Sequence, residues 1–437
     1  MHRKLKNISL PQIVAVFFAV ALQVQVTLFQ SETYAGLRVS AADFLIPVAG
    51  LIIGFSLFLK HTAWPEWKKP FSYFLVVLMS VVFVMAFLNG YYMQDSLNVW
   101  ALVNKLLGWF VLLGYLGCGA WLVTNYKASF LSLFVNVFCI FAIVTALGET
   151  INQVLKAQGI ELGLRWSWEP ICGLMTNRNA YAFLFTAASA LITFYGFRKP
   201  GIMLYSYWIL FPVIFIFNGA RVLWLCVPFL LLVFVISDWK KTFKFIFPSI
   251  AVGIFVSILL FTPEQRQYFF SMPFRTTTSL IEYTQKPDDP EVAKKAKAFG
   301  NAQRINIMKD ALDLIQKHPL QGAGLGSALY FQEKDTGARI DIIDSTPLWI
   351  LTEMGLIGLL IFGWSYFSMA IALARDAGPW KNPENLLSLS VLIVLLCFGI
   401  FSLFHELLYT RFLWFFLGLA LAIPKPSSNG RPDEQAP

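Results

Sequence analysis

Charged residues are scarce in this chain of 437 residues: aspartate, glutamate, lysine and arginine make up 14%, whereas 57% of the residues are hydrophobic. With a mean hydropathy of +0.63, this composition excludes an ordinary soluble domain. A bilayer core of about 30 Å needs roughly 20 apolar residues per crossing helix. Because backbone polar groups in lipid must be paired within their own segment, apolar runs of that kind are helices rather than strands. The runs lie near residues 10–30, 42–59, 71–93, 102–123, 128–148, 179–197, 202–217, 222–237, 245–262, 347–374, 386–404 and 412–424. The composition therefore predicts an all-α polytopic membrane protein with about 12 transmembrane helices.

Paired cysteines are lacking as well. The five cysteines stand singly, and the sequence has no CxxC pair or Cys/His cluster. This spacing excludes a disulfide framework and a zinc site, and no carboxylate cluster indicates another metal, so we expect neither metal nor cofactor. The first apolar run has no small-residue cleavage site, which predicts a retained span rather than a signal peptide. Paired halves with broken helices, which many transporters show, are also lacking.

Many of the basic residues lie in short loops on one side of the predicted bundle. They precede the first run or follow the even-numbered runs: Arg3, Lys4, Lys6, Lys60, Lys68, Lys69, Lys127, Arg198, Lys199, Lys240, Lys241, Lys244, Arg375, Lys381 and Lys425. The positive-inside rule makes this side cytoplasmic, with both termini inside. The net charge of +9 is thus explained by topology and does not indicate nucleic-acid binding.

The predicted organisation follows from these runs and loops. Residues 1–262 form transmembrane helices 1–9, and residues 263–346 form a long outer loop with an amphipathic helix. Residues 347–424 form helices 10–12, and residues 425–437 form a cytoplasmic tail.

Several arginines fall on the outer side, where the same rule disfavours them: Arg38, Arg165, Arg178, Arg221 and Arg411. An arginine kept there is a functional candidate, although interfacial arginines also snorkel to lipid headgroups. Arg221 is the sharper case, because Asn218-Gly-Ala-Arg221 forms a turn of only a few residues between two apolar runs. A guanidinium is always charged and grips phosphate with a bidentate fork.

The long loop contains one clear amphipathic pattern. From Arg304 onward, apolar residues follow helical spacing at Met308, Ala311, Leu312 and Ile315, which predicts a helix with Arg304 near its start, on the buried-facing side. The alternative for Arg304 is a local cap or ion pair.

Pro319 ends this predicted helix directly after His318. Gly322, Gly324 and Gly326 then provide a backbone able to approach a ligand closely. A GxGxG without a strand before it and a helix after it is a weak phosphate signal. For His318 the alternative to substrate binding is a structural role at the helix end.

Asp344 and Ser345 directly precede the next apolar run, whose Pro347 suits a first helical turn. Both are therefore ordinary N-cap residues. A carboxylate at this place is also a candidate general base that faces the arginines across the outer end of the bundle, so two interpretations of Asp344 stay open. Glu353 lies deeper in the run, and an ionisable group at that depth is expected to face the bundle interior or a cavity.

These motifs together resemble those of the O-antigen ligase and polymerase superfamily of bacterial envelope glycan transferases. The similar elements are Asn177-Arg178-Asn179 opening a span, the Asn218-Gly-Ala-Arg221 turn, and Arg304 followed by His318-Pro-Leu-Gln-Gly322-Ala-Gly324-Leu-Gly326. Twelve spans with a long periplasmic loop before the tenth also fit. The resemblance covers most of the chain through short motifs and implies a GT-C-like membrane fold.

One position departs from the family pattern. The ligases carry His-[Asn/Ser/Gln]-x9-Gly-x-x-[Gly/Thr/Tyr], with a histidine taken as catalytic, whereas this chain reads Asp344-Ser345-x9-Gly355-Leu-Ile-Gly358. Either Asp344 replaces the histidine as the base, or the acceptor differs, as in polymerases, or the protein is inactive.

The resemblance implies a metal-independent, inverting glycosyltransferase of the bacterial inner membrane, acting in O-antigen or other surface polysaccharide synthesis as a polymerase or ligase. It would move a glycan from a polyprenyl-pyrophosphate carrier to a glycan or lipid-linked acceptor at the periplasmic face. The expected catalytic residues are Asp344, Arg304 and Arg221. The expected substrate-binding residues are Arg38, Arg178, Asn179, His318, Gly324 and Arg411. The alternative is a transporter of lipid-linked sugars.

Overall fold

The computed structural model describes residues 9–28, 37–160, 171–286, 289, 291–292, 301–336, 343–376 and 385–423. The predicted tail 425–437 and Arg165 lie outside these residues, as do parts of the loop 263–346.

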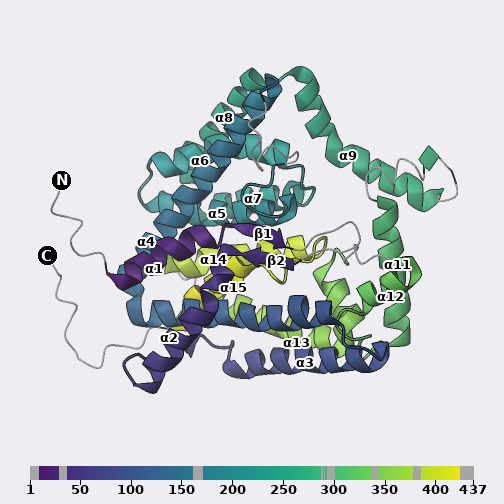
Figure 1. Ribbon diagram of the computed structural model, residues 1–437. Coiled ribbons are helices and arrows are strands. Elements are labelled where there is room, and N and C mark those ends of the chain that lie inside the picture. The colour runs from purple at the N-terminus through teal and green to yellow at the C-terminus, as the bar shows by residue number, and fades with distance from the viewer. Residues whose placement is uncertain are drawn as a thin grey trace.

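Helices form nearly all of the regular structure (Figure 1). The predicted apolar runs correspond to α1 (Leu10–Ala21), α2 (Ile46–Phe58), α3 (Tyr73–Gln94), α4 (Gly108–Ala157), α5 (Arg178–Arg198), α6 (Ile202–Asn218), α7 (Leu223–Lys241), α8 (Phe247–Leu260), α13 (Thr346–Asp376), α14 (Leu386–Ser402) and α15 (Arg411–Leu421). The long α4 covers two of the runs, and its backbone leaves helical geometry at Tyr126. A 3₁₀ turn, η1 (Ala41–Phe44), precedes α2, and the π-helices η2 (Ala101–Leu107) and η4 (Thr242–Ile246) lead into α4 and α8.

Seven helical stretches among the described residues are long and apolar enough to cross a membrane. They are Ala41–Phe58, Tyr73–Gln94, Ala101–Lys127, Phe130–Lys156, Arg178–Arg198, Leu223–Leu260 and Thr346–Asp376, and α1, α6, α14 and α15 are shorter apolar helices. The predicted all-α, multi-pass architecture is confirmed. The number of about 12 crossings and their orientation stay predictions, because α7, η4 and α8 run on as one stretch and four helices fall short of the needed length.

Burial separates a lipid-facing surface from a packed interior. Phe58 is 82% exposed and Leu360 is 63% exposed, and apolar exposure on this scale fits hydrocarbon rather than water. By contrast, every side chain of α5 from Ala180 to Phe194 is buried, because α4, α6, α7 and α14 all pack on this helix. The N-terminus of α5 therefore delivers Arg178 and Asn179 to the inside of one end of the bundle.

The first predicted run is not helical throughout, so the expectation of a helix to residue 30 is wrong. α1 ends at Ala21, and β1 (Gln25–Leu28) pairs antiparallel with β2 (Leu37–Ser40). Side chains satisfy the carbonyls near the helix end: Gln23 donates to Ala19 O and Ser40 Oγ donates to Ala21 O. A second small pairing joins β3 (Glu66–Trp67) to β4 (Ala422–Ile423).

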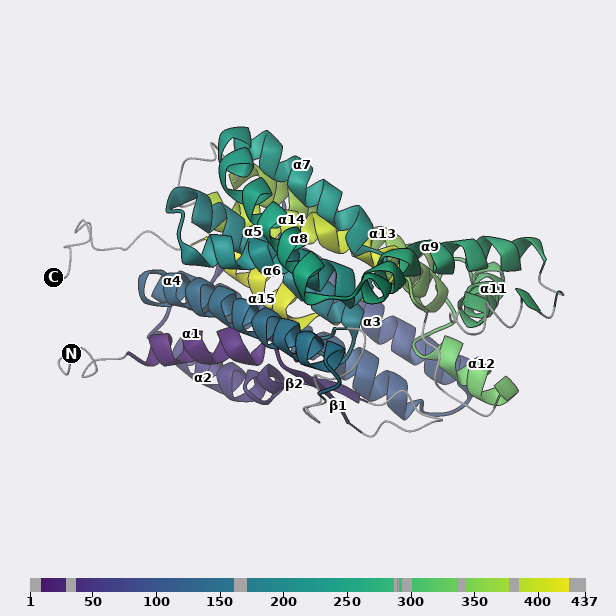
Figure 2. The ribbon, with the colours of Figure 1, turned by 90° about the horizontal axis from the view of Figure 1, so that it is seen from above.

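The described residues of the polar loop form three helices that extend along one side of the bundle, at the right of Figure 2. They are α9 (Pro263–Gln285), α11 (Asn301–Lys317) and α12 (Ser327–Thr336). The predicted amphipathic helix is confirmed as α11, and its inner face packs against α13. Ala311 and Leu314 are buried and Arg304 is partly buried. Met308 and Leu312, which the helical spacing placed in the same apolar stripe, are exposed, so that part of the prediction is wrong.

Candidate functional site

Arg304 and Asp344 form an ion pair between the start of α11 and the segment that leads into α13. Arg304 Nε donates to Asp344 Oδ2 at 2.8 Å. The helix cap is supplied by the next residue, because Leu348 N donates to Ser345 Oγ (3.4 Å) and Trp349 N donates to Ser345 O (2.8 Å). The capping role that sequence spacing offered to Asp344 thus falls to Ser345, and Asp344 holds the Arg304 guanidinium.

A single asparagine joins two further arginines. Asn218 Nδ2 donates to Ile171 O (2.7 Å) and to Arg178 O (2.9 Å), while its Oδ1 accepts from Ala220 N (3.2 Å). Gly219 follows with φ of 64°, which reverses the chain into the turn that carries Arg221. The Asn218 side chain therefore ties the α6–α7 turn to the first residue of α5 and holds Arg221 near Arg178.

The three guanidinium groups act on one another. The pKa of Arg221 is lowered to about 10, first by burial and then by the charges of Arg304 and Arg178, while Asp344 acts in the opposite direction. Three positive charges and one carboxylate leave two positive charges at this end of the bundle. Guanidinium groups repel one another in a half-buried site, and a bound multivalent anion relieves this repulsion. The cluster is therefore suited to binding such an anion.

Sequence reasoning missed a histidine at the same place. His405 lies in the turn between α14 and α15, is only 8% exposed, and has its Nδ1 3.2 Å from Asn179 Nδ2. Thr346 Oγ1 donates to His405 O (3.0 Å) and accepts from Leu407 N (3.1 Å), which ties this turn to the start of α13. The pKa of His405 is lowered to about 3 by burial and by the charges of Arg304, Arg178 and Arg221.

His405 stands in the sequence only as part of a polar turn at the outer side. No local motif marks it, because its partners come from α5 and α13. Proximity to the arginines appears only once the helix ends are placed in space.

Arg411 belongs to a different cluster. Its Nη2 donates to Asp43 Oδ2 (3.0 Å), its Nε donates to Asp43 Oδ1 (3.3 Å), and Tyr115 OH donates to the same Oδ1 (2.7 Å). This bidentate pair joins α15 to η1 and α4 and gives Arg411 a structural role. Contact of Arg411 with a substrate remains a prediction. Arg38 lies in β2, opposite Thr27, and its side chain lies outside the described part of the structure.

The glycine segment packs against two helices. Gly324 has φ of 89°, and a Cβ there would overlap the backbone of Gly90 in α3. Ala323 N and Gly324 N donate to the carbonyls of Thr352 and Glu353, where α13 is interrupted at Gly355 (φ of 67°). The close approach that the glycines allow is therefore to α3 and α13, and ligand contact at Gly324 remains a prediction.

His318 ends α11, where its N–H donates to Leu314 O and its carbonyl accepts from Gly322 N. These backbone hydrogen bonds hold the glycine segment against the end of α11, which fits a structural role of His318 at the helix end. Substrate contact by the His318 side chain remains a prediction.

A second buried charge cluster lies beside the glycine segment. Lys105 Nζ is 3.5 Å from Glu406 Oε2 and lies over the rings of Trp349 (4.2 Å) and Tyr409 (4.8 Å). Glu353 is 2% exposed and interacts electrostatically with Lys105, so it faces the interior as predicted. Consecutive residues of one turn, His405 and Glu406, thus face the arginines and the lysine respectively.

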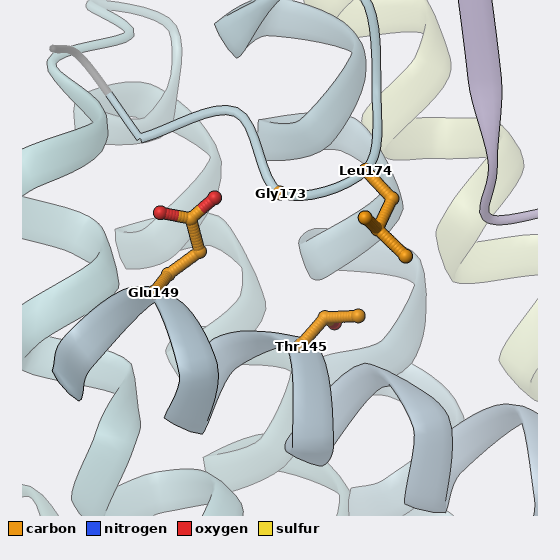
Figure 3. Close-up of a pocket in the computed structure, with 4 residues that line it drawn as sticks. All are labelled: Thr145, Glu149, Gly173 and Leu174. Carbon is orange, nitrogen blue, oxygen red and sulfur yellow. The ribbon is translucent and has the colours of Figure 1, made fainter. Parts of the chain in front are cut away.

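A small pocket lies behind the segment that leads to Asn177. Figure 3 shows the Glu149 carboxylate beneath the backbone of Gly173 and Leu174, with Thr145 one helical turn away. At about 10 Å³ the pocket has room for roughly one water molecule, far less than a sugar needs. Among the residues that the structure describes, no group of three or more His, Cys, Asp or Glu side chains is placed to hold a metal ion.

Comparison with known proteins bears on the same residues. Residues 205–363 match a family model described as O-antigen ligase, and this match confirms the resemblance drawn from the motifs. The matched range contains Arg221, Arg304, the glycine segment and Asp344, whereas Arg178 and His405 lie outside it. No curated protein matches the chain. The family implies an enzyme that transfers glycosyl groups.

Proposed function

We propose that this chain, which carries an O-antigen ligase region, transfers a glycan from a polyprenyl-pyrophosphate carrier to a sugar acceptor at the outer face of the bacterial inner membrane. Surface polysaccharide is the product, made by polymerisation or by ligation to a lipid-linked acceptor. The observation that supports this proposal most directly is the convergence of Arg178, Arg221 and Arg304 at one end of an apolar bundle.

The net positive charge of this cluster is equal and opposite to that of a pyrophosphate esterified to a polyprenyl chain at one end and to a sugar at the other. Such a group carries two negative charges at neutral pH, and the cluster has two positive charges in excess. The guanidinium of Arg304 is oriented by Asp344, and Arg178 and Arg221 are held together by Asn218. Because the Arg304 guanidinium and the backbone segments that carry Arg178 and Arg221 are positioned before the substrate arrives, less reorganisation is needed when the anion binds.

The reaction develops its new charge on the pyrophosphate. As the bond between the anomeric carbon and the phosphate oxygen breaks, the electron pair goes to that oxygen, which the arginines stabilise without a metal. The acceptor oxygen attacks from the opposite side of the anomeric carbon, so the configuration inverts. A proton acceptor must take the hydroxyl proton, and Asp344 is the candidate that the sequence motif offers for this role.

The test measures transfer in nanodiscs from a polyprenyl-pyrophosphate oligosaccharide to the envelope glycan fraction of the source organism. We expect Arg221→Ala and Arg304→Ala each to reduce kcat by about 10²–10³-fold, the typical cost of removing one such donor. Arg375→Ala serves as the matched control, because Arg375 is exposed at the far end of α13.

Two outcomes would contradict the proposal. Full activity of both arginine variants, with normal folding, would remove the pyrophosphate site. Movement of the lipid-linked sugar across a vesicle membrane without any new glycosidic bond would instead support a transporter of lipid-linked sugars.

A further inference from the structure

We propose that His405, rather than Asp344, accepts the proton of the acceptor hydroxyl, and that the bound pyrophosphate donor switches this base on. This inference rests on the proposed glycosyl transfer and names a catalytic residue for it. The histidine that the ligase motif carries at the start of α13 is, in this chain, supplied by the α14–α15 turn.

The position of His405 is set from two sides. Thr346, two residues after Asp344, bonds with its Oγ1 to His405 O and Leu407 N, so the turn is tied to the beginning of α13. The imidazole itself meets Asn179 in the first turn of α5, next to Arg178. His405 thus lies between the two helix ends that carry the ion-paired Asp344 and the arginine of α5.

The Asn179 amide, whose nitrogen is placed 3.2 Å from Nδ1, is the hydrogen-bond partner that sets the tautomer of His405. The amide oxygen and nitrogen of an asparagine are assigned from the hydrogen-bond network, so either can face Nδ1. When the amide oxygen faces Nδ1, it accepts the Nδ1–H bond and leaves the lone pair of Nε2 free for the acceptor proton. A histidine oriented by an asparagine is an established arrangement for a general base.

Charges from three neighbouring elements act on the imidazole. Arg178 of α5, Arg221 of the α6–α7 turn and Arg304 of α11 disfavour its protonation, and Asp344 lies before α13, paired with Arg304. On its own turn, Glu406 is paired with Lys105. In the free enzyme burial, followed by these arginine charges, lowers the pKa of His405 to about 3, which is too low for an efficient base near neutral pH.

Donor binding changes this balance. The two negative charges of the pyrophosphate offset two of the three guanidinium charges, so the opposition to an imidazolium falls. The pKa of His405 is therefore higher in the complex than in the free enzyme, although burial, the largest cause of the lowered pKa, remains. A base that is stronger in the complex than in the free enzyme favours deprotonation at the loaded site.

The step balances as a simple displacement. The acceptor O–H bond breaks, its proton moves to His405 Nε2, and the acceptor oxygen forms the new bond to the anomeric carbon. The bond from that carbon to the phosphate oxygen breaks, and its electron pair stays on the pyrophosphate. The imidazolium then gives its proton to the departing polyprenyl pyrophosphate, which has gained a negative charge.

Asp344 is better suited to positioning. Its carboxylate accepts a charge-assisted hydrogen bond from Arg304 at 2.8 Å, and such a bond stabilises the unprotonated form. Taking a proton would weaken this pair at the moment when Arg304 must stabilise the leaving group.

The experiment compares His405→Gln and His405→Ala with wild type in the nanodisc transfer assay, counting released polyprenyl pyrophosphate. We expect kcat to fall by about 10²–10⁴-fold, the usual contribution of a general base, while KM for the donor stays within about twofold because the arginines are intact. Added imidazole should restore part of the activity of His405→Ala. His61→Ala is the matched control, since His61 is exposed between α2 and α3.

The wild-type pH profile provides a second readout. The acidic limb of kcat should lie at higher pH than that of kcat/KM, because kcat reports the complex and kcat/KM the free enzyme. Asn179→Asp, which can only accept from Nδ1, should retain activity, whereas Asn179→Leu should lose most of it.

Each contrary result has a distinct meaning. Full kcat in both His405 variants, or a loss that imidazole does not rescue and that leaves the pH profile unchanged, would overturn the assignment of His405. If only Asp344→Ala removes the acidic limb, Asp344 is the base. An inactive wild type, or active Arg221→Ala and Arg304→Ala proteins, would overturn the proposed function itself.

Discussion

Replacing His405 by glutamine should make the protein less sensitive to acid. Burial and three guanidinium groups lower the pKa of His405 from 6.5 to about 3 in the folded protein, whereas the unfolded chain keeps the ordinary value. Because the folded pKa is the lower one, the unfolded state binds the proton first. The folded state therefore loses relative stability as the pH falls below about 6.5, until His405 is itself protonated near pH 3.

The size of this effect follows from the pKa difference. A pKa difference of about 3.5 units at roughly 1.4 kcal/mol per unit corresponds to about 5 kcal/mol of folding stability over the whole window. About 3 kcal/mol of this stability is lost by pH 4.5. A glutamine at position 405 is long enough to keep a hydrogen bond to Asn179, as His405 does. Because glutamine does not titrate, the variant does not lose this stability. The part of the penalty due to the guanidinium charges is reduced by salt, whereas the part due to burial is not.

The assay is thermal unfolding in nanodiscs at about pH 7.5 and about pH 4.5 in low salt. Acid protonation of carboxylates affects wild type and variant alike, so the comparison isolates His405. We expect the apparent Tm of wild type to fall by several degrees more than that of His405→Gln, and His61→Gln to behave as wild type. If the apparent Tm of wild type and of His405→Gln falls equally, then His405 is not held as a buried, neutral imidazole whose protonation the arginines disfavour.

Three further predictions concern the anion site and the packing around it. Inorganic pyrophosphate at low salt should raise the apparent Tm of wild type, and this rise should disappear in Arg221→Ala and Arg304→Ala. Arg411→Ala should lower the free energy of unfolding by about 3 kcal/mol, the cost of breaking a buried pair, and a double-mutant cycle with Asp43→Ala should show less than additive loss. Gly324→Ala should destabilise far more than Gly159→Ala by thermal unfolding, since both have positive φ but only Gly324 meets another backbone. Equal effects of the two glycine substitutions would contradict the packing role of Gly324.

The amino-acid sequence predicts most of the helices, and it singles out two of the three arginines that the structure brings together. Hydropathy alone locates the apolar runs, and helical spacing places Arg304 on the inward face of α11. A turn too short to leave the membrane face marks Arg221. Each of these signals lies within a single segment, where a periodic pattern or a misplaced charge is visible without knowledge of the fold.

The remainder depends on which helix ends meet. Arg178 and Arg411 look alike in the sequence, as arginines at the start of an apolar run, yet Arg178 lies near Arg221 and Arg304 whereas Arg411 pairs with Asp43. The glycines indicate a close approach but not its partner, which is Gly90 of α3. A hydropathy pattern says nothing of such contacts, because it is nearly the same for every arrangement of the helices in lipid.

The substitution at position 344 shows how a motif and a site can differ. In the sequence the ligase histidine is replaced by Asp344, and the motif appears broken. In the structure the start of α13 carries both Asp344 and Thr346, and Thr346 holds the turn of His405. An imidazole therefore stands next to the arginines although the motif lacks it. The loss of a residue from a linear pattern removes a chemical group only if no other segment brings that group to the same place.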